Sequence, residues 1–153
     1  MKPLLIVYAG AHAGTTWQLI EAALAGARSA EPRLPVLLRP ALAAGPADLE
    51  HAGAVLFATP EKFGYMAGAL KDFFDRSFYP LEGRVAGLGY ALIISAGNDG
   101  LGALESVQRI ARGFPLKPLA PPLRVVGPPT EVDLTEAHAL GTALAAGLAL
   151  GIF

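Results

Sequence analysis

One segment, residues 54–76, limits the possible folds of this chain more than any other part of the sequence. It opens with an unbroken apolar run, residues 54–58, which is typical of a parallel strand buried on both faces. We expect Pro60 to end this strand, because proline has no N–H for a ladder hydrogen bond. From Met66 onward, apolar side chains recur every three or four residues, which predicts a helix with one buried face. The segment is therefore predicted to be a strand, a tight loop around Gly64 and a helix.

The rest of the chain repeats this alternation of apolar runs and helical stripes. Such alternation indicates parallel βαβ units with right-handed crossovers, and so an α/β fold. In folds of this class, ligands bind beyond the carboxyl ends of the strands. We expect five strands, at residues 3–8, 35–39, 54–58, 89–95 and 123–126.

The composition narrows the class of protein. A length of 153 residues predicts a single domain over residues 1–153, and 53% hydrophobic against 16% charged residues argues against disorder. A net charge of −1 argues against a nucleic-acid partner or an anionic membrane surface. The absence of cysteine excludes disulfides, thiol catalysis and cysteine-ligated metals. The first strand leaves no room for a signal peptide and the apolar segment 139–153 is shorter than the about 20 residues of a membrane span, so we expect a cytoplasmic protein.

Residues 59–76 also carry a family resemblance. They read TPEKFGYMAGALKDFFDR, which resembles the flavin-contacting segment of the flavodoxin-like superfamily, and is similar to that of FMN-dependent NAD(P)H:quinone oxidoreductases and FMN reductases. The similarity is dense over this segment and weaker over the first loop and residues 95–102. It implies a three-layer αβα sandwich with a five-stranded parallel sheet of order 2-1-3-4-5. It also implies that the loops after strands one, three and four surround an FMN.

The first of these loops fits a phosphate. Its backbone amides precede a helix N-terminus, which carries partial positive charge, and Thr15 and Thr16 add hydroxyls and candidate helix caps. Flavodoxin-type loops likewise bind phosphate through neutral donors, but they carry Ser or Thr where this chain has Gly10 and His12. His12 would restore one donor, best when protonated. The alternative is an ordinary strand-to-helix turn. The expected phosphate-binding residues are Gly10, Ala11, His12, Ala13, Gly14, Thr15 and Thr16.

The second and third loops would hold the flavin ring. The aromatic and proline side chains of the second loop offer flat apolar contact, and its peptides offer hydrogen-bond donors. By the resemblance, the third loop faces the pyrimidine edge of the ring. The alternatives are that the aromatics are core or turn residues and that the third loop is a plain turn. The expected ring-binding residues are Pro60, Glu61, Lys62, Phe63, Gly64, Tyr65, Ser95, Ala96, Gly97, Asn98 and Asp99.

The function implied by the resemblance is hydride transfer from NAD(P)H through FMN to a quinone or similar small acceptor. Because the flavin carries this chemistry, we expect no catalytic acid or base and no metal ligands. We also expect a homodimer or homotetramer, in which the aromatics of residues 78–80, just after the helix, either cover a flavin or pack in the core. The alternatives are a non-enzymatic flavodoxin-type electron carrier, which the net charge of −1 disfavours, and a flavodoxin-like module with a decayed flavin site.

Overall fold

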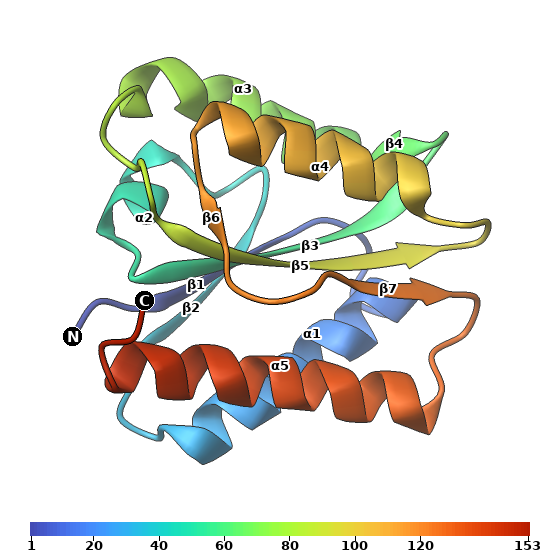
Figure 1. The fold of residues 1–153 in the computed structure, drawn as a ribbon. Coiled ribbons are helices and arrows are strands. Elements are labelled where there is room, and N and C mark those ends of the chain that lie inside the picture. The colour runs from blue at the N-terminus through green and yellow to red at the C-terminus, as the bar shows by residue number, and fades with distance from the viewer.

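The predicted alternation of strands and helices is present throughout the computed structural model, which describes residues 1–153. The strands form one twisted sheet between two layers of helices (Figure 1). The strands are β1 (Leu4–Tyr8), β2 (Val36–Pro40), β3 (Ala54–Lys62), β4 (Tyr65–Met66), β5 (Gly89–Ala96), β6 (Lys117–Pro118) and β7 (Leu123–Val126). The helices are α1 (Thr15–Ala30), α2 (Pro46–His51), α3 (Gly68–Leu81), α4 (Leu101–Gly113) and α5 (Glu131–Ala149).

The order of the sheet confirms the flavodoxin-like prediction. The strands follow one another as β2-β1-β3-β5, and β6 and β7 both pair with β5 on its outer side. Every pair is parallel except the short β3–β4 hairpin. The predicted fifth strand, residues 123–126, is present as β7, and the short β6 before it was not predicted. Pro121 and Pro122 lie in the gap between them, where proline cannot donate ladder hydrogen bonds.

Alternate side chains of the buried strands supply a separate core on each face of the sheet. Leu5 and Val7 of β1 join the core under α3 and α4, whereas Leu4 and Ile6 join the core under α1 and α5. This division follows from the period of two along a strand. None of the helices combines the length and apolarity needed to cross a bilayer.

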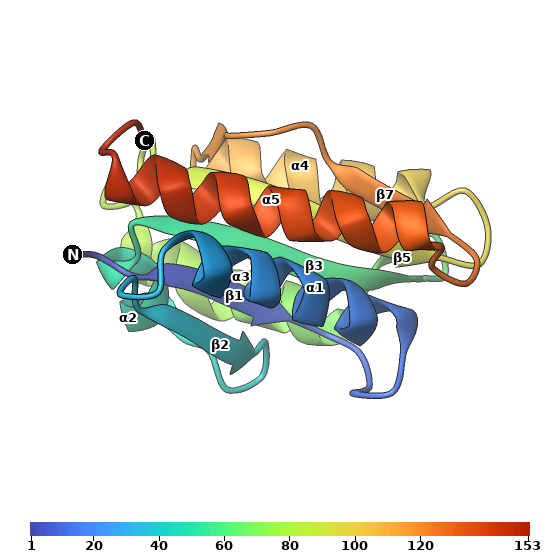
Figure 2. The same cartoon turned by 90° about the horizontal axis from the view of Figure 1, so that it is seen from below.

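Helices α1 and α5 lie side by side on one face of the sheet (Figure 2). Glycines in both helices allow this close approach. A Cβ atom on Gly26 would lie 2.0 Å from the carbonyl oxygen of His138, and one on Gly141 would lie 1.8 Å from that of Ala23. Thr142 Oγ1 also donates a hydrogen bond to the carbonyl of Gly26 (3.3 Å). The α1–α5 contact therefore depends on the absence of two side chains.

The structure corrects the predicted end of the third strand, because β3 passes through Pro60 and continues to Lys62. The reason lies in the neighbouring strand. Ala58 accepts a hydrogen bond from Ala9 on the β1 side, and Pro60, two residues on, faces the same side. Since β1 ends at Tyr8, opposite Ala58, the missing N–H of Pro60 leaves no ladder hydrogen bond unmade.

The helix that follows also differs from its prediction at both ends. Met66 belongs to β4, so α3 begins two residues later, at Gly68. Residues 78–80 lie inside α3, not after it. They lie at the amino end of the sheet, where Phe78 packs edge-on against Phe114 (5.4 Å between ring centroids) and Tyr79 is exposed. Within its own chain this segment is remote from the carboxyl ends of the strands, so it does not cover a ligand there.

Candidate functional site

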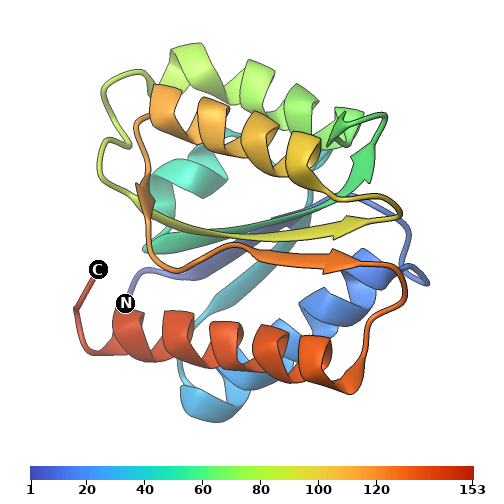
Figure 3. The same cartoon turned by 45° about the vertical axis from the view of Figure 1, so that its right-hand side comes forward.

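The carboxyl ends of β1, β3 and β5 meet at a cleft of about 580 Å³, a size typical of cofactor sites. Figure 3 shows the loops that follow these strands gathered at one end of the molecule, with both chain termini at the other. The cleft is lined by Gly10, Ala11, Gly14, Thr15, Thr16, Gln18, Pro60, Glu61, Lys62, Ser95, Ala96, Gly97, Gly127, Pro128 and Pro129.

Eleven of the residues predicted from the sequence are among these fifteen. The residues that sequence reasoning missed are Gln18 and the turn of residues 127–129, which joins β7 to α5. Gln18 lies one turn into α1, so helical spacing from Gly14 could have placed it near the loop. The turn of residues 127–129 reaches the cleft only through the order of the sheet, and its Gly-Pro-Pro sequence alone indicates nothing more than a loop.

The N-terminus of α1 opens onto the cleft. Its N-cap is Gly14, with no side-chain cap, so the expected capping by Thr15 or Thr16 is wrong. Instead, the buried Thr16 hydroxyl lies 2.6 Å from the Ser95 hydroxyl and ties the first loop to the third. An uncapped first turn leaves backbone N–H groups free to bind an anion, and the helix dipole favours one there.

Few charges line the cleft. Glu61 and Lys62 are its only charged lining residues. Glu61 Oε2 accepts a hydrogen bond from the backbone N–H of Ala103 in the first turn of α4 (3.2 Å), so this carboxylate already has a helix N-terminus as its partner. The donors offered at the α1 end are therefore neutral amides and hydroxyls, the donor set predicted for an FMN phosphate.

The second loop is a β-hairpin in which β4 turns back along β3. Lys62 pairs with Tyr65, so the turn consists of Phe63 and Gly64, with φ of 52° and 70°. Two positive φ angles are the signature of a type I′ turn, which twists as the strands do. Glycine adopts this conformation freely, whereas for Phe63 it is strained.

Helix α4 anchors this hairpin. The Ser106 hydroxyl accepts a hydrogen bond from the backbone N–H of Met66 (3.1 Å), and the Glu61 bond to Ala103 adds a second tie. A Cβ atom on Gly102 would lie 2.0 Å from the carbonyl oxygen of Gly64, so the hairpin rests directly on the helix backbone. Residues 60–62 of the cleft wall are thus held in place by α4.

Seven of the predicted residues do not line the cleft: His12, Ala13, Phe63, Gly64, Tyr65, Asn98 and Asp99. Phe63 is fully exposed at the hairpin tip, and the Asp99 carboxylate accepts a hydrogen bond from the backbone N–H of Leu101 (3.0 Å) at the start of α4. The His12 ring stacks on Trp17. Cofactor contacts stay predictions for these seven residues and for the eleven that line the cleft.

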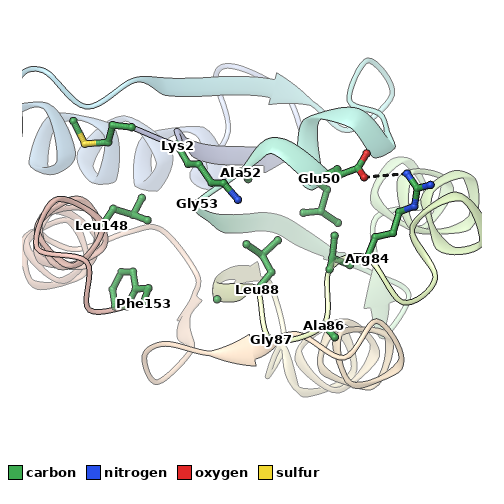
Figure 4. A pocket seen from close by; sticks show the side chains of 14 residues that line it. Lys2, Glu50, Ala52, Gly53, Arg84, Ala86, Gly87, Leu88, Leu148 and Phe153 are labelled. Atoms are coloured by element: carbon green, nitrogen blue, oxygen red, sulfur yellow. Dashed lines mark hydrogen bonds and ion pairs between the residues drawn. The ribbon is translucent and has the colours of Figure 1, made fainter.

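A second cavity, of about 380 Å³, lies at the opposite end of the sheet, beside the amino ends of β1, β3 and β5. Lys2 and Phe153 line it, and an ion pair between Arg84 and Glu50 (3.0 Å) bounds it (Figure 4). The last turns of α2 and α5 border it, and helix C-termini carry partial negative charge. Unlike the cleft, this cavity therefore presents no helix N-terminus to a ligand.

Two displaced pKa values occur away from the cleft. The hydrogen bond to Asp75 raises the pKa of Lys71 on the surface of α3. Burial raises the pKa of Tyr90, near the amino end of β5. Neither residue lines the cleft, so neither supplies it with acid–base chemistry.

Comparison with solved structures gives the same fold. An archaeal flavodoxin superposes with a TM-score of 0.83 at 22% identity, covering 96% of this chain and 99% of that chain. A WrbA-like flavodoxin from Agrobacterium tumefaciens superposes with a TM-score of 0.76 at 19% identity, covering 98% and 99%. Rubredoxin oxygen:oxidoreductase from Desulfovibrio gigas matches with a TM-score of 0.82 at 16% identity, where this chain spans 37% of the longer protein. At these identities the likeness concerns the fold.

Sequence comparison supplies the family. None of the curated protein sequences compared with the chain matches it. The family model for NADPH-dependent FMN reductases matches residues 36–119, more than half of the chain, including the whole of residues 59–76. This match confirms the predicted superfamily and FMN as the cofactor. The chain belongs to the NADPH-dependent FMN reductase family.

Proposed function

We propose that the protein binds FMN in the cleft at the carboxyl ends of β1, β3 and β5 and passes hydride from NAD(P)H to a quinone or similar small acceptor. The observation that carries this proposal is the uncapped N-terminus of α1, which opens onto a cofactor-sized cleft with neutral donors. Bound FMN supplies the hydride chemistry, and the protein binds and orients it. We also propose that the protein assembles as a homodimer or homotetramer.

Different loops of the chain would bind the phosphate and the ring of the cofactor. The phosphate would be held by the backbone amides of the first turn of α1, with the Thr15 hydroxyl beside them. The ring would lie between the hairpin residues 60–62 and the third loop, residues 95–97, which line the same cleft. The Thr16–Ser95 hydrogen bond ties the first loop to the third, and would fix the phosphate-binding and ring-binding residues relative to one another before the cofactor binds. Such preorganisation lowers the entropy lost when the cofactor is ordered.

Mixing the FMN-loaded protein with NADPH under anaerobic conditions is expected to bleach the flavin absorbance, and a quinone added afterwards is expected to restore it. Free FMN at the same concentration is the control, because it measures the uncatalysed reaction. Absorbance that bleaches with dithionite but responds to NADPH no faster than free FMN does would identify an electron carrier and would contradict the proposed activity.

A further inference from the structure

The His12 side chain lies outside the cleft and makes two contacts with aromatic residues. Its Nε2 atom is 3.0 Å from the Tyr8 hydroxyl oxygen. Its ring stacks on the indole of Trp17, with 4.2 Å between centroids and 23° between planes. Tyr8 and Trp17 also contact each other, at 5.3 Å between centroids. The three rings therefore form one cluster, which we call the Tyr8–His12–Trp17 clip.

The clip connects the two elements that flank the first loop. Tyr8 is the last residue of β1 and is 6% exposed, whereas Trp17 lies in the first turn of α1. Between them, residues 9–14 read AGAHAG. All of these except His12 are glycine or alanine, and Ala9 is buried in the core beside β1, so among residues 10–14 only His12 has a side chain long enough to reach a neighbouring element. A single backbone hydrogen bond closes within the loop, from the N–H of Gly14 to the carbonyl of Ala11 (3.0 Å).

The loop has a particular need for such a clip. Glycine gives the backbone its greatest freedom, the alanine methyl groups are too short to restrain it, and ordering such a loop on ligand binding costs entropy. A contact that orders the loop beforehand removes part of this cost and so raises affinity. Such a contact raises the affinity of the loop for its ligand, although the contacting side chain does not touch that ligand.

We propose that His12 is a positioning residue: the Tyr8–His12–Trp17 clip holds the first loop in the conformation that binds the FMN phosphate. This inference rests on the proposed FMN site. In this proposal His12 orders the loop and does not itself donate a hydrogen bond to the phosphate, which is the role expected from the sequence. It also explains how a loop with Gly10 and His12 in place of hydroxyl residues still presents an ordered set of backbone donors.

Three single variants separate positioning from direct contact. His12→Ala removes the stack and the hydrogen bond, and is expected to raise the FMN dissociation constant about tenfold. His12→Phe keeps an aromatic ring on Trp17 and is expected to recover most of that loss. Tyr8→Phe removes only the hydroxyl partner of His12, and is expected to weaken FMN binding about threefold. Riboflavin, which lacks the phosphate, is expected to bind all three variants as it binds the wild type.

Two further measurements complete the test. Trp17 is the only tryptophan in the chain, so its emission in the flavin-free protein reports the clip directly and should change in His12→Ala. His138→Ala, an exposed histidine on α5, is the matched control and should change neither emission nor affinity. Combining Tyr8→Phe with His12→Phe should add no further loss, because both remove the same hydrogen bond.

The outcomes distinguish this inference from the proposed function. If wild-type protein prefers FMN, and His12→Phe loses as much affinity as His12→Ala while Tyr8→Phe loses none, His12 is a phosphate ligand and the inference is overturned. Unchanged FMN affinity in all three variants would overturn it as well. If wild-type protein binds FMN and riboflavin equally, the phosphate site itself is absent, and the proposed site fails together with the clip's role.

Discussion

Replacing Gly141 with alanine is expected to lower the free energy of unfolding by about 2 kcal/mol. Helix propensity alone predicts the opposite sign, because alanine is favoured over glycine by about 1 kcal/mol inside a helix. The new Cβ atom would lie 1.8 Å from the carbonyl oxygen of Ala23 and 2.6 Å from its carbon. Backbone atoms cannot rotate away as a side chain can, so α1 and α5 must separate, at a cost of about 3 kcal/mol or more.

Denaturant unfolding measures this effect, with Gly68→Ala as the matched control. Gly68 also lies in a helix, α3, but a Cβ atom there meets nothing within 4 Å. The control is expected to change stability by less than about 0.5 kcal/mol, or to raise it. If Gly141→Ala is as stable as the control, the two helices do not pack as closely as described.

Gly102→Ala is expected to weaken FMN binding about tenfold and to lower stability by a smaller margin, about 1 kcal/mol. The added Cβ atom would lie 2.0 Å from the carbonyl oxygen of Gly64. The hairpin must then lift from α4, which breaks the hydrogen bonds of Met66 to Ser106 and of Ala103 to Glu61. Residues 60–62, which line the cleft, move with it.

The matched control for this variant is Gly113→Ala, at the other end of the same helix. A Cβ atom there meets nothing within 4 Å, so FMN affinity is expected to stay at the wild-type value. Fluorescence titration of FMN against both variants measures the difference. Equal affinities would show that the hairpin position does not control the flavin site.

The parts of the fold that the sequence predicted well are those that local patterns determine. The apolar runs of β1, β3 and β5 are buried on both faces, and such runs have few alternatives to a central strand. The details that sequence reasoning missed depend on neighbours far away in the chain. Whether Pro60 ends its strand depends on where β1 ends, and the unpredicted strand β6 exists because Lys117 and Pro118 lie opposite Gly89 and Tyr90 of β5.

In the site, too, local patterns predicted the general location, whereas the roles of single side chains depend on their contacts in the folded chain. Small and polar residues in the three loops indicated the cleft, because the sheet order brings the loops together. The role of a single side chain in those loops could not be read in this way. Thr16 resembles a helix cap in the sequence, yet its hydroxyl bonds to Ser95, 79 residues away. His12 resembles a phosphate donor, yet its ring lies against Trp17, in the first turn of α1.

The most direct test of the central claim is a comparison of FMN and riboflavin binding to the wild-type protein, by titration of flavin fluorescence at constant pH and ionic strength. The two ligands share the isoalloxazine ring and differ in the phosphate. An uncapped α1 N-terminus that binds the phosphate through several charge-assisted hydrogen bonds predicts a dissociation constant for FMN about a hundredfold or more below that for riboflavin. Equal dissociation constants would contradict the placement of the phosphate at α1, and with it the orientation of the cofactor in the cleft.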